Sequence, residues 1–156
     1  MSKIIIVAEK NNISDIKEIL KTLNLPAGRQ APDVEVNFID KELVAKIPPV
    51  GGKGNDAANE TYLVFSYDDS ELREACRPLE IKKISFGFSE EADFFASDQI
   101  NTEEGISFKL NYKGNSVPVW IKSPFDNEKI YNVLAAICVA VISGLNIVEI
   151  SEKIKG

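Results

Sequence analysis

Residues 3–23 read KIIIVAEKNNISDIKEILKTL, and two hydrophobic periods meet within this stretch. The apolar run from Lys3 to Ala8 is typical of a strand that is buried on both faces of a parallel sheet. After a polar turn, apolar residues recur with the spacing of one helix face, at Ile16, Ile19, Leu20 and Leu23. Asn12 or Ser14 is expected to cap this helix. A strand followed closely by a helix indicates an α/β fold.

The chain continues this pattern and then changes to an antiparallel one. Three more strands are expected in the first part, at residues 34–38, 62–66 and 81–88. Short helical segments are expected between them, at Lys41–Lys46 and Glu71–Cys76, the second capped by Asp68-Asp69-Ser70. Three strands then follow in succession, at residues 92–100, 105–112 and 117–121, the last two joined by the hairpin turn Lys113-Gly114-Asn115.

The last part of the chain is expected to supply an edge strand and two helices. Pro118 cannot donate a ladder hydrogen bond, so its strand is expected at a sheet edge. A helix that is apolar almost all round, and therefore buried, is expected from residue 126 or 127 to 143, ended by Gly144. Residues 146–149 resemble a capping box for a final short helix. The predicted fold class is α/β: a mostly parallel sheet flanked by helices, with a small antiparallel β excursion.

Length, charge and hydropathy limit the class of protein. The 156 residues fit one domain, residues 1–156, and the Pro- and Gly-rich stretch Pro48–Asn55 makes residues 48–60 the best place for an internal boundary. With 18 basic and 24 acidic side chains, the formal net charge is −6, which argues against nucleic-acid binding. Neither a signal peptide nor a bilayer-spanning stretch is visible, so we expect a cytoplasmic protein with no membrane partner.

Several catalytic chemistries lack the residues that they need. The chain has no histidine, which excludes a Ser-His-Asp triad, a Cys-His pair and an imidazole zinc site. Cys76 and Cys138 are too few for a disulfide framework or a four-cysteine metal site, and both are expected to pack in the core. We therefore expect neither a catalytic residue nor a bound metal.

Two segments are candidates for a phosphate-binding loop. Gly51-Gly52-Lys53-Gly54 lacks both the Ser or Thr after the lysine and the preceding strand of a P-loop, which favours a flexible loop. The turn at residues 9–14 lies in the right place, between a strand and a helix, but it contains no glycine. Glu9 and Asp15 would also repel a polyphosphate. Neither segment therefore predicts nucleotide binding.

Asp68 and Asp69 follow the carboxyl end of a predicted strand, which is the edge where α/β proteins bind ligands. A pair of carboxylates could hold Mg²⁺. The alternative, which we favour, is a helix cap with a second charge in the first turn.

The C-terminal third carries a resemblance to a known family. Residues 130–140 read IYNVLAAICVA and run into SGLNIVEI at 143–150, while LVFSYDD at 63–69 and SFG at 85–87 lie upstream. This succession resembles the middle, ATP-binding domain of the Mur ligases, which join amino acids to peptidoglycan precursors. The resemblance covers about residues 62–155, and the order and spacing look most similar to the D-alanyl-D-alanine-adding branch.

The resemblance also implies where a cofactor site would lie. The family uses ATP and Mg²⁺, and its lysine-bearing phosphate loop would fall on residues 9–14, where Ile13 takes the place of the lysine. The family's His-Asn near the adenine falls on Glu128 and Lys129. Asn132 alone is retained from that motif, so the resemblance implies that Asn132 could contact a base. The alternative for Asn132 is a polar residue in the first turns of a buried helix.

These features predict a Mur-ligase-like middle domain that is contracted, has a degenerate P-loop and lacks ligase activity by itself. It would act as a binding or scaffold module, with no cofactor expected although the family would use ATP and Mg²⁺. The first alternative is one part of a split ATP-dependent, D-alanyl-D-alanine-adding ligase, whose missing domains come from another protein chain. The second alternative is a small anion- or metabolite-binding α/β domain that shares only the fold.

Overall fold

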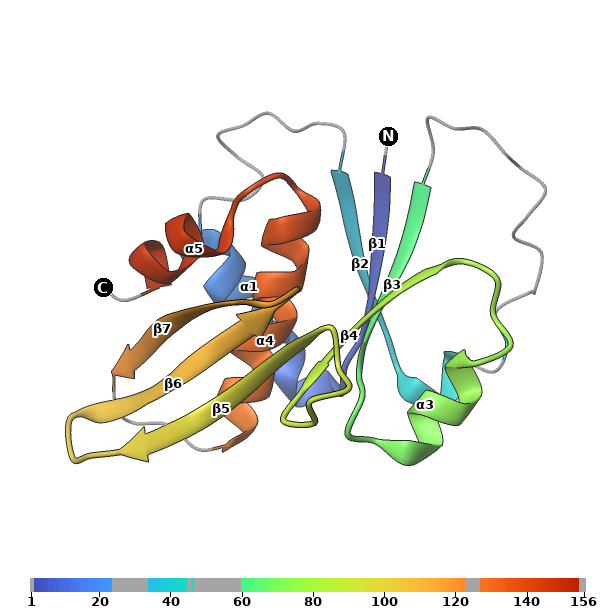
Figure 1. Ribbon diagram of the computed structural model, residues 1–156. Helices are drawn as coiled ribbons and strands as arrows, with labels where there is room; N and C mark the ends of the chain where they lie inside the picture. Colours follow the sequence, from blue (N-terminus) through green and yellow to red (C-terminus); the bar gives the residue numbers. More distant parts are fainter. Residues whose placement is uncertain (1, 24–33, 45, 47–59, 123–126, 155–156) are drawn as a thin grey trace.

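The computed structural model describes residues 2–23, 34–44, 46, 60–122 and 127–154, and its strands form one seven-stranded sheet in the order β2-β1-β3-β4-β5-β6-β7 (Figure 1). The strands are β1 (Ser2–Val7), β2 (Val34–Ile39), β3 (Glu60–Ser66), β4 (Lys82–Gly87), β5 (Phe94–Asn101), β6 (Gly105–Tyr112) and β7 (Asn115–Lys122). The helices are α1 (Lys10–Thr22), α2 (Lys41–Val44), α3 (Ser70–Cys76), α4 (Asn127–Ile142) and α5 (Ile147–Ile154).

The sheet has a parallel and an antiparallel part, so the predicted fold class is confirmed. Neighbouring strands from β2 to β5 are parallel, whereas β5–β6 and β6–β7 are antiparallel. The pairing of β4 with β5 is limited to Phe86–Phe94 and Gly87–Phe95, which marks the change between the two parts. Strand β7 lies at the sheet edge, as Pro118 predicts.

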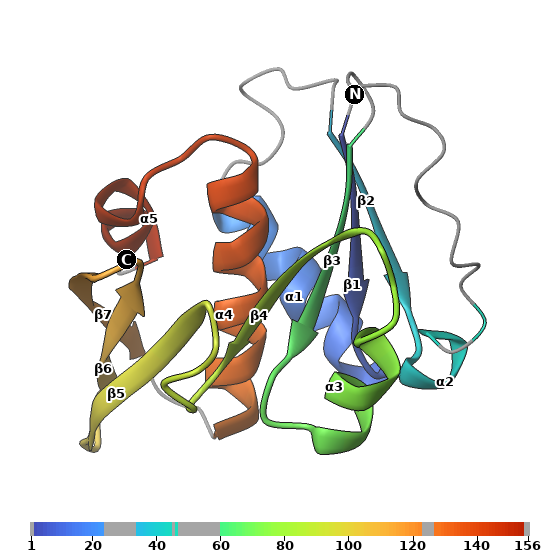
Figure 2. The same ribbon diagram turned by 45° about the vertical axis from the view of Figure 1, so that its right-hand side comes forward.

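Helices cover both faces of the parallel part (Figure 2). The strand β1 shows why, because its side chains alternate between two cores. Ile4 and Ile6 pack in a cluster with residues of α1, α4 and α5, whereas Val7 packs in a second cluster with residues of α2 and α3. An unbroken apolar strand is therefore required here, as the sequence indicates.

Helix α4 is the centre of the larger core. Each residue from Asn132 to Ala140 is buried. The helix contacts β3, β4, β5, α1 and α5, so almost its whole circumference is covered. This explains why residues 130–140 are apolar all round instead of showing one apolar stripe.

Several local signals in the sequence form the structures that they predict. The Asp69 side chain accepts a hydrogen bond from the Leu72 N–H at 3.1 Å and so caps α3. Gly144 follows α4 with a φ of 111°, a conformation that favours glycine. Asn146 and Glu149 exchange side-chain-to-backbone hydrogen bonds of 2.9 and 3.4 Å, which is the expected capping box of α5.

The predicted cap of the first helix is wrong. Helix α1 begins at Lys10 and its N-cap residue is Glu9, so Asn12 and Ser14 lie inside the helix. The Asn12 side chain instead contacts α4, where it donates to Glu128 at 3.3 Å. The stretch 48–59, which holds most of the predicted internal boundary, lies outside the described residues.

Candidate functional site

The main candidate site is a pocket at the carboxyl ends of β1 and β3. These two strands are neighbours, and the chain leaves β1 toward β2 on one side while β3 lies on the other side. Open α/β sheets bind ligands at such a reversal of strand order. The pocket has a volume of about 220 Å³ and is lined by residues of seven elements and of the connections between them: Val7, Ala8, Glu9, Asn12, Ile16, Lys41, Ser66, Asp69, Leu72, Phe86, Glu128, Tyr131, Asn132 and Ala135.

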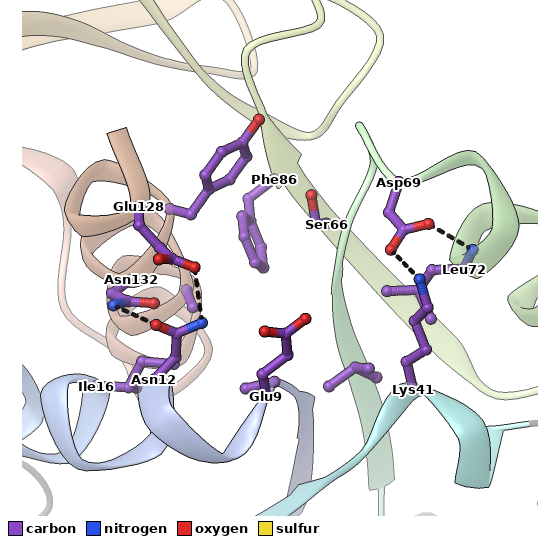
Figure 3. A pocket seen from close by; sticks show the side chains of 14 residues that line it. Glu9, Asn12, Ile16, Lys41, Ser66, Asp69, Leu72, Phe86, Glu128 and Asn132 are labelled. Carbon is purple, nitrogen blue, oxygen red and sulfur yellow. Dashed lines mark hydrogen bonds and ion pairs between the residues drawn. The ribbon is translucent and has the colours of Figure 1, made fainter. Parts of the chain in front are cut away.

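The junction of β1 and α1 forms one side of this pocket. The strand ends at Val7 and the helix begins at Lys10, so that only Ala8 and Glu9 connect them. Glu9 has an extended backbone and makes no side-chain cap hydrogen bond. In Figure 3 its carboxylate stands in the middle of the pocket, between the side chains of α4 and those of α2 and α3.

A polar network joins α1 to α4 on the next side of the pocket. The Asn132 Nδ2 group donates to Asp15 at 2.9 Å and lies 3.4 Å from the Asn12 oxygen. Lys129 pairs with Asp15 at 3.1 Å, and Asn12 donates to Glu128 (Figure 3). The segments that the resemblance assigns to the phosphate loop and to the adenine contact are therefore adjacent. Here their polar groups bind one another.

The opposite side of the pocket holds the ammonium group of Lys41. It pairs with Asp69 at 2.9 Å and with Glu71 at 3.1 Å, and these hydrogen bonds raise the pKa of Lys41. Partial burial raises the pKa of Asp69. The Lys41 ammonium and the Leu72 N–H together lower the pKa by more than burial raises it, so the pKa of Asp69 lies below its usual value. Asp69 is therefore an ionised helix cap whose charge Lys41 balances.

The second carboxylate of the pair, Asp68, binds the turn after β4 and helix α4. It accepts hydrogen bonds from Phe88 N at 2.8 Å, Ser89 N at 3.3 Å and the Tyr131 hydroxyl at 2.7 Å. A Cβ on Gly87 would lie 2.7 Å from the Asp68 carboxylate, so only glycine permits this approach. Burial, together with the bond to Asp68, raises the pKa of Tyr131. Asp69 is therefore the helix cap that the sequence predicts, whereas Asp68 is not a charge in the first turn of α3 but holds the turn after β4 and Tyr131.

The pocket is acidic at its rim and apolar at its base. Its described lining contains the carboxylates Glu9, Asp69 and Glu128 but a single cationic group, Lys41, which already has two carboxylate partners. Phe86 and Ile16 are buried side chains of the base. Across the described part of the chain, no cluster of three or more Asp, Glu or Cys side chains could hold a metal ion.

The other residues that the sequence analysis singled out lie in three different places. Cys76 and Cys138 are buried, and burial raises the pKa of both thiols, that of Cys76 to about 11. Residues 51–54 lie outside the described residues. Asn132 does line the pocket, and its contact with a base stays a prediction.

Sequence reasoning missed Lys41 and Tyr131. The position of Lys41, just beyond the carboxyl end of β2, was the one available signal.

Within the residues that the structure describes, every helix is too short or too polar to cross a membrane.

Comparisons with known proteins agree on one family. The model of the Mur ligase middle domain matches residues 54–140, more than half of the chain. The UDP-N-acetylmuramate–L-alanine ligase of Alkaliphilus metalliredigens (strain QYMF) is 31% identical over 96 residues, which are 61% of this chain and 21% of that ligase. The UDP-N-acetylmuramoyl-L-alanyl-D-glutamate–2,6-diaminopimelate ligase of Alkaliphilus oremlandii (strain OhILAs) is 35% identical over 89 residues, 55% of this chain and 17% of that ligase.

Solved structures share the fold. A crystal structure of MurF from Acinetobacter baumannii superposes with a TM-score of 0.64 at 14% identity, over 99% of this chain and 45% of that one. The MurF ligase of Thermotoga maritima in complex with ADP gives a TM-score of 0.65 at 16% identity, over 96% of this chain and 48% of that one.

The matches settle the family and leave the branch open. The chain spans 17% and 21% of the two curated ligases named above, so their whole activities are not transferred to it. These two ligases add different amino acids. The superposed MurF structures are only 14% and 16% identical to this chain and show the fold alone. The D-alanyl-D-alanine branch therefore stays a prediction. The pocket, the fold and the sequence match lead to one conclusion: the chain belongs to the Mur ligase middle domain family and is related to the peptidoglycan precursor ligases.

Proposed function

We propose that this chain is a contracted Mur ligase middle domain with a degenerate phosphate loop, which does not carry out the ligase reaction by itself and acts as a binding or scaffold module. The family reaction, as the resemblance implies, forms an acyl phosphate from ATP and then an amide. Transfer of a phosphoryl group depends on cations that stabilise the negative charge of the transition state.

The connection between β1 and α1 is the observation that carries this proposal. A P-loop needs Gly-x-x-x-x-Gly-Lys between a strand and a helix, because its backbone N–H groups surround the phosphates and its lysine reaches them. Here Ala8 and Glu9 form the whole connection, and neither is a glycine. Ile13, which falls at the lysine position, lies within α1. Such a connection has no room for a phosphate cradle.

The charges around the pocket support the same proposal. Lys41 and Lys129 bind Asp69 and Asp15, so both ammonium groups are already neutralised by carboxylates. Loss of a single electrostatic donor in an active site costs about 10²–10³ in rate, or about 2.7–4 kcal/mol. Because this chain lacks both the loop and its lysine, we expect no measurable phosphoryl transfer.

Titration calorimetry with Mg-ATP and Mg-ADP tests this proposal directly. We expect no binding heat at ligand concentrations up to the millimolar range. The MurF ligase of Thermotoga maritima, which was solved in complex with ADP, is the positive control under the same conditions. A micromolar affinity of this chain for either nucleotide would contradict the proposal.

A second candidate function is one part of a split ligase. The observation that favours it is coverage, because the chain spans 21% of the L-alanine ligase that it matches and so corresponds to a part of such an enzyme. In this version another protein chain supplies the phosphate loop and the substrate domains.

Co-purification and a ligase assay distinguish the two candidates. Chains that carry the missing domains, encoded in neighbouring reading frames, are co-expressed with a tagged form of this protein. A split ligase requires both a stable complex and ATP-dependent amide formation that neither chain shows alone. Partners that neither bind nor restore amide formation would remove this candidate.

A further inference from the structure

The pocket raises the question of which ligand its present chemistry would favour. The inference that follows rests on the proposed function, because a working ATP site would already have an occupant. Three features of the described residues bear on it: the charge of the rim, the composition of the base and the size of the space.

Two of the three rim carboxylates, Glu9 and Glu128, have no lysine or arginine partner among the described residues, whereas Asp69 pairs with Lys41. Within the described residues, no ion pair involves Glu9 or Glu128, and both side chains are exposed. Figure 3 shows the two carboxylates reaching the pocket from different elements, Glu9 from the start of α1 and Glu128 from α4. Among the described residues, the Glu128 carboxylate accepts a single hydrogen bond, from the neutral Asn12 amide at 3.3 Å. An anionic ligand would be repelled here, and a cationic group would be attracted.

The base of the pocket provides an apolar and aromatic surface. Phe86 is buried, and its ring centre lies 6.4 Å from that of Tyr131. Tyr131 also contacts Phe88 edge-on at 5.2 Å, and its hydroxyl is held by Asp68, so its ring is fixed in place. Aromatic faces of this kind bind flat apolar groups and also attract cations.

The size of the pocket suits a small ligand. Its volume of about 220 Å³ is below the range of roughly 300–1,000 Å³ that is usual for sites of drug-sized ligands. A single ring with a short side chain is of the right order, whereas a nucleoside triphosphate would extend beyond the pocket and carries the wrong charge for Glu9 and Glu128.

We propose that this pocket binds a small organic cation, with an aromatic or other apolar body against Phe86 and Tyr131 and a protonated amine between Glu9 and Glu128. The preference for a positive charge distinguishes this ligand class from the polyphosphates for which the family's site is built. It also separates the proposal from a general metabolite-binding domain, which would have no preferred sign of charge.

Three ligands of similar shape test the charge preference: 2-phenylethylamine, 2-phenylethanol and phenylacetate, titrated at low salt and followed by backbone amide shifts in NMR spectra. We expect the amine to bind, with shifts at Ala8, Asn12 and Tyr131, the alcohol to bind more weakly and the carboxylate not to bind. The amine's affinity should fall when salt is raised to 0.5 M.

A double variant, Glu9→Gln with Glu128→Gln, should weaken the binding of the amine about fivefold or more while leaving that of the alcohol unchanged. Glutamine can still accept the bond from Asn12, so the variant is expected to fold, which its amide spectrum checks. Glu103→Gln, on the exposed turn after β5, is the matched control and should leave the amine's affinity unchanged.

The outcomes separate this inference from the proposed function. If the amine, the alcohol and the carboxylate bind equally, or none of them binds at millimolar concentration, the charge preference is overturned while the absence of ATP binding still stands. If Mg-ATP binds in the same pocket, the proposed function fails first, and this inference fails with it.

Discussion

Helix α4 and the pocket rim beside it differ in burial and in the kind of contacts that their side chains make. The helix is packed on nearly all sides, and its residues from Ile130 to Ala140 lie in the part of the chain that the family model matches. The rim is partly exposed: Asp69, and Asp15 just outside the pocket lining, pair with lysines of other elements, while Glu9 and Glu128 form no ion pair among the described residues. The difference teaches that the hydrophobic core follows the family's pattern, whereas the side chains of the rim are arranged by contacts between distant segments of this chain. Three substitutions, taken from the core outward, test this difference.

Leu134→Ala should have the largest effect on stability. Leu134 is fully buried in the middle of α4, and its truncation would leave a cavity in the core. We expect a loss of about 2–5 kcal/mol in the free energy of unfolding, measured by urea denaturation. Val148→Ala on α5 is the control, because Val148 is 54% exposed and its truncation should change stability little. Equal losses in the two variants would show that α4 is not the centre of the framework.

The framework was largely predictable from the sequence because its signals are local. An apolar run, a glycine after a helix and a capping box each depend on residues within a few positions of one another, so α4, Gly144 and the cap of α5 were predicted correctly. The start of α1 was not, because Asn12 is a good capping residue by type but contacts α4, which is 116 residues away in the sequence. Tertiary contacts decided the role of that side chain.

Asn132→Ala should have an intermediate effect, because Asn132 belongs to both regions. It is buried within α4, and its amide donates to Asp15 and Asn12 of α1. Its truncation removes hydrogen bonds to the half-buried Asp15 and Asn12 side chains, each of which contributes about 0.5–1.5 kcal/mol. Asn11→Ala, at an exposed position of α1, is the control and should be neutral. A neutral Asn132→Ala variant would mean that the α1–α4 network does not stabilise the fold, and the base-contact interpretation of Asn132 would gain weight.

The pocket could be predicted only in outline. The sequence placed Asp68 and Asp69 at the carboxyl end of a strand, the edge where α/β proteins bind ligands, and the family resemblance named Asn132. Its chemistry did not follow, because the decisive pairs are far apart in the sequence: 28 residues for Lys41–Asp69, 63 for Tyr131–Asp68 and 117 for Asn132–Asp15. No local pattern in a single sequence carries such pairings, so the internal neutralisation of the site became visible only in the fold.

The smallest effect is expected at the rim itself, in the pH dependence of stability. The native pKa of Asp69 lies below its usual value of 3.8, so the folded state binds fewer protons than the unfolded state as the pH falls through this range. The stabilisation from Asp69 is therefore present above about pH 5 and is lost as the pH falls through the native pKa. Asp69→Asn keeps a good helix cap but cannot titrate.

Urea denaturation of the wild type and of Asp69→Asn between pH 2.5 and 6 measures this contribution. The difference in unfolding free energy between the two proteins should shrink as the pH falls, and it should be smaller throughout at 0.5 M salt, because the Lys41–Asp69 pair is partly exposed. Lys41→Gln should reduce the difference in the same way, since it removes the ammonium group that lowers the pKa. If the two curves stay parallel at all pH values, the ion pair contributes nothing to stability. Breaking the Lys41–Asp69 pair would then cost no stability, and this pair would not distinguish the rim from the core.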